Sequence, residues 1–206
     1  MHRVLALALL ATAAANSLPA ALKPVVVSAQ SPASHVSELE TYIGAYQLEG
    51  TGIARIMLRG TGLVAEIGAA RPARLKATSQ GVFEAEGVEP YRVTFDTARM
   101  HLQVARATSS QTGRRILVTP DVLGRYAGAY PLSDTLAMVV TLEGGRLIAQ
   151  ATGASRHPLF PESTTRFFVQ DSASTDVAHL EFGADPDGKA FVVFRQMDAA
   201  QKVYRK

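Results

Sequence analysis

The chain of 206 residues contains no cysteine. This absence excludes disulfides, zinc–thiolate sites, iron–sulfur clusters and cysteine nucleophiles. Stability must therefore come from a hydrophobic core, for which a hydrophobic content of 47% is sufficient. Lysine and arginine are scattered and form no basic stripe, so the net charge of +3 gives no reason to expect nucleic-acid binding.

Sequence motifs of catalysis and metal binding are also missing. No Gly-x-Ser-x-Gly turn exposes a nucleophilic serine, and no Gly-x-Gly-x-x-Gly pattern precedes a helix. The five histidines lack the spacing that places two imidazoles on one metal ion. We therefore predict no catalytic residue, no cofactor and no metal site, and a protein that is not an enzyme.

The first 29 residues have the features of a signal peptide. A positive charge at Arg3 precedes an apolar run at 4–15, which is too short to span a bilayer. Cleavage is predicted after Ala29, with Ala15 as the alternative site. We expect the mature protein to be periplasmic or secreted, without a membrane span, because no later segment is long and apolar enough.

A short motif occurs twice in the chain. Tyr42–Leu48 reads YIGAYQL, and Tyr126–Leu132, 84 positions later, reads YAGAYPL. Self-similarity at a fixed period indicates a repeated architecture. We predict two homologous units, a first degenerate repeat at 36–117 and a second repeat at 120–206. Further pairs at the same offset are Leu58 and Leu142, Gly60 and Gly144, Leu75 and Leu159, and Phe83 and Phe167.

Each unit reads as about eight short strands separated by turn residues, a pattern typical of a small antiparallel barrel. Gly144-Gly145 predicts a tight hairpin, and the segment 184–189 (ADPDGK) predicts a turn. Single helical turns at 37–41 and 119–123 lead into the repeated motif. The predicted fold is therefore all-β, with two tandem barrels, each preceded by a short helical turn.

The second unit carries a recognisable series of strings. They are "LGRYAGAYPL", "LEGGRLIAQATG", "HPLFPESTTRFFV", "LEFGADPDGKAFVVFRQ" and a closing "YRK". In this order they resemble the lipocalin-like C-terminal domain of serine-β-lactamase-related, penicillin-binding-protein-like hydrolases, a domain of unknown function. The resemblance covers about residues 123–205. It implies a lipocalin-like antiparallel barrel and an exported hydrolase as its usual context.

The resemblance implies no catalytic residue, because the chemistry of that family resides in the preceding hydrolase domain. The Ser-x-x-Lys motif of such a domain is absent from this sequence. The first unit has drifted from the family pattern, since LKATS at 75–79 replaces LFPES at 159–163.

Five residues of the second unit are candidates for contact with a ligand or partner: Tyr126, Tyr130, Arg156, His157 and Glu162. The two tyrosines fall on one face of the predicted strand Arg125–Leu132, where they either line a pocket or bury their rings in the core. In one reading of the cluster of the other three, Arg156 or His157 lies at a barrel mouth and contacts an anionic ligand or a partner. In the other reading, Pro158 and Pro161 shape an edge strand and Glu162 accepts hydrogen bonds from nearby backbone.

The expected function is that of a non-catalytic, exported accessory or binding module. Its predicted partner is a periplasmic hydrolase or a small apolar or peptide-like ligand. Two alternatives remain open. One is a structural envelope protein that packs through exposed edge strands. The other is a hydrolase whose site is built from dispersed residues that no motif reveals.

Overall fold

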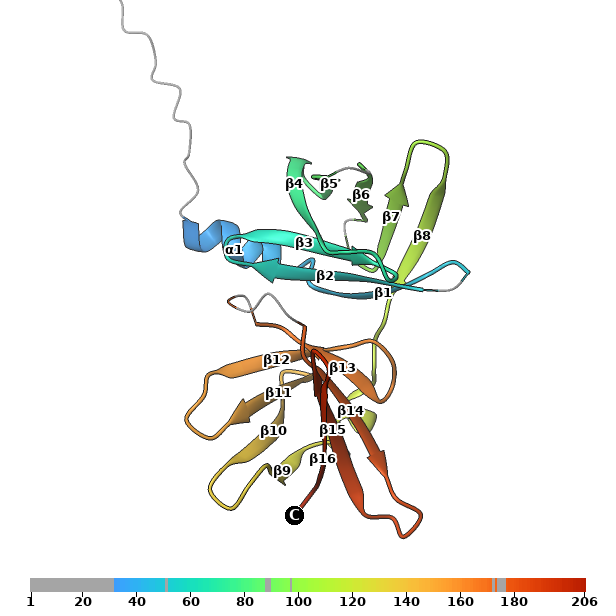
Figure 1. The fold of residues 1–206 in the computed structure, drawn as a ribbon. Helices are drawn as coiled ribbons and strands as arrows, with labels where there is room; N and C mark the ends of the chain where they lie inside the picture. The colour runs from blue at the N-terminus through green and yellow to red at the C-terminus, as the bar shows by residue number, and fades with distance from the viewer. Residues whose placement is uncertain (1–31, 51, 88–89, 97, 172, 174–176) are drawn as a thin grey trace, which may run out of the picture. The chain divides into compact units, whose positions relative to one another are not determined.

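The computed structural model describes residues 32–206 except 51, 88–89, 97, 172 and 174–176, and the predicted signal peptide lies outside the described residues. Within the described part the chain forms two short helices and sixteen strands (Figure 1). The prediction of an all-β fold with two eight-stranded antiparallel sheets is confirmed. Neither helix in this part of the chain has the length and apolar character needed to cross a membrane.

The first sheet is a closed barrel that follows helix α1 (Pro32–Glu40). Each strand pairs with the next, and the last strand also pairs with the first, where Tyr46 lies opposite Arg115. Its strands are β1 (Gly44–Leu48), β2 (Ile53–Arg59), β3 (Gly62–Ile67), β4 (Ala73–Ser79), β5 (Val82–Ala85), β6 (Arg92–Phe95), β7 (His101–Ala105) and β8 (Ser110–Arg115).

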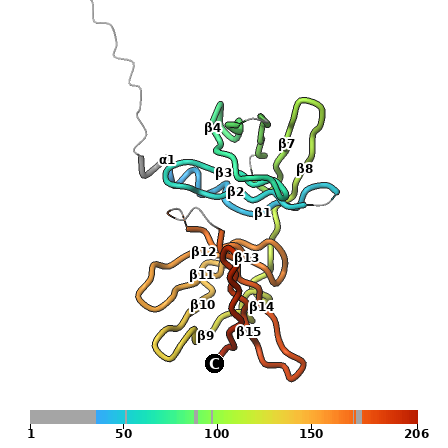
Figure 2. Tube along the Cα trace, in the orientation of Figure 1, coloured from blue at the N-terminus to red at the C-terminus, as the bar shows by residue number. Residues whose placement is uncertain are grey.

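The second sheet follows helix α2 (Pro120–Gly124) and repeats the same strand order. It is nearly closed, because the N–H of Lys206 donates to the carbonyl of Ala129 at 3.0 Å. Its strands are β9 (Gly128–Pro131), β10 (Ala137–Glu143), β11 (Arg146–Ala151), β12 (Arg156–Pro161), β13 (Arg166–Val169), β14 (His179–Ala184), β15 (Ala190–Gln196) and β16 (Ala199–Tyr204). Figure 2 shows the chain completing the first set of strands before it enters the second.

The predicted turns form as their residues indicate. Gly144 and Gly145 have φ angles of 55° and 76°, and they join β10 to β11 with Glu143 opposite Arg146. Glycine accepts these positive angles without the steric penalty of a Cβ atom. The turn at 184–189 is closed by a hydrogen bond of 3.0 Å from the N–H of Asp185 to the carbonyl at position 189.

The opening strand of the second barrel begins later than predicted. Arg125 and Tyr126 continue the turn of α2, since their N–H groups donate to the carbonyls of Val122 and Leu123. Strand pairing therefore starts at Gly128 and not at Arg125. The sequence pattern missed this boundary because a single helical turn and an extended segment both tolerate these residues.

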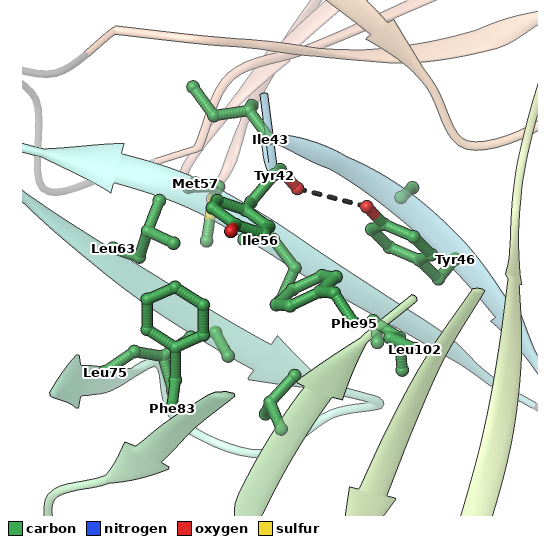
Figure 3. Packing of buried hydrophobic residues seen from close by; sticks show 14 of the residues in the cluster. Tyr42, Ile43, Tyr46, Ile56, Met57, Leu63, Leu75, Phe83, Phe95 and Leu102 are labelled. Carbon is green, nitrogen blue, oxygen red and sulfur yellow. Dashed lines mark hydrogen bonds between the residues drawn. The ribbon is translucent and has the colours of Figure 1, made fainter. Parts of the chain in front are cut away.

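Each barrel has its own apolar core, and the two cores contain equivalent aromatic side chains. Tyr42, Phe83 and Phe95 pack with ring centroids 4.8–5.8 Å apart in the first barrel (Figure 3). Their counterparts Tyr126, Phe167 and Phe182 pack at 4.6–5.8 Å in the second. Leu39 of α1 and Leu123 of α2 are also buried, so each helix contributes to the core of the barrel that follows it.

The repeated motif contains one hydrogen bond that both barrels share. The hydroxyl of Tyr46 donates to the carbonyl of Tyr42 at 3.2 Å, and that of Tyr130 donates to the carbonyl of Tyr126 at 2.8 Å (Figure 3 for the first pair). Burial raises the pKa of Tyr46 to about 12, although the charge of Arg115 opposes the shift. The hydroxyl therefore stays protonated and remains a donor at physiological pH.

The glycine of the motif makes room for an arginine from the last strand. In the second barrel, the guanidinium of Arg205 donates to the carbonyls of Arg125 and Ala127 at 2.6 and 3.3 Å. A Cβ atom at Gly128 would lie 2.5 Å from Cδ of Arg205. In the first barrel Arg115 occupies the same place and bonds the carbonyls of Thr41 and Ile43. The arginine thus satisfies carbonyls at the start of each barrel that no strand pairs.

Gly128→Ala is expected to lower the free energy of unfolding by about 1–3 kcal/mol, because the added methyl group overlaps the Arg205 side chain. Urea unfolding of the variant and of the wild type measures the loss. The same substitution in an Arg205→Ala background should be less harmful, because only backbone strain then remains. An equal loss in both backgrounds would contradict the packing argument.

Candidate functional site

Outward-facing side chains of the second barrel pack against the first barrel. Phe160 of β12 and Phe168 of β13 stack with ring centroids 5.3 Å apart. Both are buried, and both belong to the apolar cluster of the first barrel, which includes Met57. Their sequence neighbours Leu159 and Phe167 point into the second barrel and belong to its own core. We call Phe160, Glu162, Phe168 and Gln170 the docking face.

Glu162 is the charged residue of the docking face, and 1% of its side chain is exposed. Its Oε1 accepts a hydrogen bond from Nε of Arg55 on β2 of the first barrel. Its Oε2 lies 2.9 Å from Nδ1 of His179 and 3.0 Å from Nε of Arg166. Arg55 is held in turn by Glu66, which lies opposite it on β3. A buried carboxylate needs such partners, because removal from water is costly.

The environment of Glu162 keeps the carboxylate ionised. Burial would raise its pKa, but the hydrogen bonds from His179 and Arg55 outweigh burial and lower the pKa to about 2. A carboxylate that holds an imidazole at Nδ1 is also the arrangement that orients a general base in hydrolases. Here the same carboxylate is shared with two arginines, and no hydroxyl among the described residues bonds His179. The arrangement fits packing better than proton transfer.

Gln170 satisfies backbone groups that the first barrel leaves open. The register of β1 against β2 ends with Gly44 opposite Ile56, so Leu58 has no strand partner on that side. The Gln170 amide donates to the carbonyl of Leu58 at 2.8 Å and accepts from its N–H at 3.1 Å. The side chain therefore takes the place of a missing strand residue. Each of these buried backbone groups would otherwise cost about 1–3 kcal/mol.

The first barrel meets the docking face with alternate residues of one strand. Arg55, Met57 and Arg59 point outward from β2, because side chains alternate between the two faces of a strand. Arg55 bonds Glu162, and Arg59 donates to the backbone carbonyl of Asp171. Met57 lies between the two arginines and is 1% exposed. The contact is therefore an apolar centre flanked by two charged groups.

The duplicated counterparts of both surfaces are exposed. In the first barrel, the positions equivalent to the docking face are Lys76, Thr78, Glu84 and Glu86, and all four are exposed. In the second barrel, Val139 stands at the position equivalent to Arg55 and is 45% exposed. Each barrel thus uses a different face for the contact, and its unused face has become polar or open to water.

The five candidate residues do not form one site. Tyr126 and Tyr130 pack on Phe182 at the α2 end of the second barrel, and their hydroxyls bond the backbone carbonyls of Thr164 and Tyr126. Of the other three, Arg156 and His157 lie on β12 and Glu162 directly follows it. Arg156 is exposed and forms an ion pair with Glu143 across the sheet, His157 is partly buried near the carbonyl of Gln170, and Glu162 belongs to the docking face.

The interpretation of β12 as an edge strand is wrong. β12 pairs with β11 through Pro158 and with β13 through Pro161. Proline is tolerated here because its missing N–H falls at positions where the ladder does not need a donor. Glu162 also differs from expectation, since its carboxylate is held by side chains and not by backbone N–H groups.

The sequence reasoning missed Arg55, Arg166, Gln170 and His179. One signal was present. Phe167-Phe168 places two adjacent large apolar residues in a strand, and a strand that faces water on one side should alternate. The doublet therefore indicates a strand that is buried on both faces. It does not identify the partner strand, because Arg55, which bonds Glu162, lies 107 residues before Glu162 in the chain.

Comparison with known proteins shows that the part of the chain that contains the second barrel is similar to a known domain family. Residues 112–203 match the profile of a domain of unknown function, DUF3471. Over 86 residues the chain is 36% identical to Penicillin-binding protein 4* of Bacillus subtilis (strain 168), an alignment that covers 41% of this chain and 18% of that protein. The chain thus matches less than a fifth of the length of that relative.

One solved structure is also similar to the chain. It comes from Bacteroides fragilis NCTC 9343 and is described as a candidate outer membrane protein. The match covers 82% of this chain and 99% of the other, with 11% sequence identity and a TM-score of 0.24. Similarity at that level carries no argument about fold or function.

Glu162→Gln is expected to reduce stability at pH 7 by about 3 kcal/mol, because it removes a buried negative charge that is paired with Arg55 and Arg166 and held by His179. The folded-state pKa of about 2 lies below the ordinary value of 4.5, so this stabilisation is complete above about pH 5 and disappears as the pH falls towards 2. Urea unfolding at several pH values should show a weaker pH dependence in the variant. An equal dependence of the unfolding free energy on pH in the variant and the wild type would contradict the role given to Glu162. Glu181→Gln, in the exposed pair with Arg195, is the control.

Gln170→Met is expected to destabilise the protein by about 2–4 kcal/mol, because both backbone groups of Leu58 lose their partner while the volume is nearly kept. Hydrogen exchange should also accelerate at the Leu58 amide. Gln201→Met removes a single exposed hydrogen bond to Leu132 and serves as the control. Unchanged protection of the Leu58 amide would contradict the role of Gln170.

Proposed function

We propose that the chain is a non-catalytic accessory module of the bacterial cell envelope. Its second barrel is a docking unit, and in this chain the first barrel occupies the docking face. The observation that carries the proposal is the burial of Phe160, Glu162 and Phe168 against the first barrel. Two of these residues lie in the string LFPES, the feature by which the second unit resembles its family.

The partner we propose is a serine hydrolase of the penicillin-binding type. The support is the relative named Penicillin-binding protein 4*, whose matching segment is a small part of a much longer chain. The predicted signal peptide supports the same compartment. In this proposal the second barrel contributes binding surface, and the chemistry belongs to the partner.

Purified mature protein is expected to show no covalent labelling by a fluorescent penicillin and no hydrolysis of short-chain esters or D-alanyl peptides. The reason is that the carboxylate of Glu162 and the imidazole that it contacts, His179, are held in the contact between the barrels. A penicillin-binding enzyme of known activity serves as the positive control. Activity that is lost on substitution of one residue of this chain would contradict the proposal.

Met57→Asp is expected to separate the two barrels, because it places a charge at the apolar centre of the contact. Backbone ¹⁵N relaxation should then report faster tumbling of each barrel, and the variant should unfold in two transitions where we expect one for the wild type. Val139→Asp, on the outward face of β10, is the matched control and should tumble as the wild type does. A Met57→Asp protein that tumbles and unfolds as one body would contradict docking through this face.

A further inference from the structure

A cavity of about 220 Å³ opens inside the second barrel. Its wall is made mainly of inward-facing apolar side chains, while His157, Asp171 and Gln196 add polar atoms. For comparison, an apolar cavity of about 150 Å³ is large enough to bind benzene. The main apolar wall residues are Met138, Ala149, Ala151, Ala178, Leu180 and Phe194.

In the first barrel a tyrosine occupies the equivalent position. Tyr91 packs against the core of the first barrel, and its hydroxyl lies 3.4 Å from the carbonyl of Ala65. The guanidinium of Arg106 lies 5.5 Å from the centre of the ring. Burial raises the pKa of Tyr91. The interior of the fold at this level therefore accepts one phenol ring.

The strand registers identify Ala178 as the counterpart of Tyr91. The carbonyl of Tyr91 accepts a hydrogen bond of 2.8 Å from the N–H of Ala85, and the carbonyl of Ala178 accepts one of the same length from Val169. Val169 is the counterpart of Ala85 at the repeat offset of 84. The backbone is thus equivalent in the two barrels, and the second barrel lacks the ring that fills the first.

A second difference enlarges the same space. Ala151 in the second barrel stands where the first barrel has Ile67, which is buried. The cavity wall of the second barrel therefore has a smaller side chain than the first barrel at two positions, Ala178 and Ala151. Met138 and Phe194 are larger than their counterparts Ala54 and Val104, yet the cavity remains. Large side chains on one wall and alanines on the other leave a space bounded by apolar groups.

We propose that this cavity binds a small neutral aromatic molecule, with one ring in the position that Tyr91 occupies in the first barrel. The ring would pack against Met138, Leu180 and Phe194. A hydroxyl on the ring would lie near the carbonyl of Ala149, the counterpart of Ala65. His157 lies at the cavity with Nδ1 3.4 Å from the carbonyl of Gln170, so a proton on Nδ1 leaves Nε2 as an acceptor. The carboxylate of Asp171 at the cavity disfavours an anion, and the mainly apolar wall favours a neutral ligand.

This site is independent of the docking role proposed above. The cavity lies among inward-facing residues, whereas Phe160 and Phe168 of the docking face point outward to the first barrel. Asp171 belongs to both, since it lines the cavity and its backbone carbonyl accepts from Arg59, but the rest of the cavity wall does not take part in docking. The two proposals therefore fail separately.

The test uses the mature chain labelled with ¹³C at the methionine methyl groups and titrated with 4-methylphenol, which is the side chain of tyrosine. The Met138 resonance should shift and saturate at a ligand concentration on the order of 1 mM. Met57 and Met100 belong to the first barrel and should not move. Toluene has the aromatic ring without the hydroxyl, and cyclohexanol has the hydroxyl without the aromatic ring. Toluene should bind the site at least as strongly as cyclohexanol, because the packing of the aromatic ring supplies the affinity.

Ala178→Tyr supplies the missing ring from the chain itself and should weaken the Met138 response at least tenfold. Should that variant fail to fold, Ala151→Ile copies the buried residue of the first barrel and gives the same test. Tyr91→Ala should create a second site, seen as a rise in melting temperature with 4-methylphenol that exceeds that of the wild type. An unmoved Met138 resonance in the wild type, or an equal shift in the wild type and a folded filling variant, would overturn the proposal.

Discussion

A buried carboxylate at the contact between two barrels is the constraint on which the arrangement depends. Glu162 has almost no contact with water, so its charge must be balanced by protein groups. Glu162 directly follows β12, Arg166 comes from the neighbouring strand β13, His179 from β14, and Arg55 from the first barrel. The charge is therefore balanced only when three strands of one barrel and one strand of the other are in place.

The two barrels have the same strand order but use different surfaces for their contact. The docking face of the second barrel meets the outward residues of β2 in the first, and neither surface is used in its duplicated copy. This is a heterologous contact, in which unlike faces meet and one copy of each face remains free. The free copies carry exposed polar or charged residues such as Lys76 and Glu84, which prevent the same contact from continuing to another molecule.

The two barrels have also diverged in their interiors. The first is filled at one level by Tyr91 and Ile67, whereas the second has alanines at both positions and retains a cavity. The shared features are those that position the chain at the start of each barrel. The tyrosine hydroxyl bonds a carbonyl four residues earlier, and an arginine of the last strand covers the motif glycine.

Much of the fold could be predicted because it depends on residues close together in the chain. The paired glycines at 144–145 and the turn at 184–189 each specify a local backbone conformation. Matching residues at a constant offset of 84 also predicted the same strand order in both units. The start of β9 was misplaced by three residues for the same reason, since a single helical turn has a weak local signal.

The functional surface could not be predicted in the same way. The first-barrel partners of Glu162 and Gln170 lie 107 and 112 residues away, and no sequence spacing connects them. Local propensity and the internal repeat were enough to establish two eight-stranded antiparallel sheets. Only the folded structure decided which face is buried by the other barrel and which barrel keeps a cavity, because both depend on side chains that distant strands bring together.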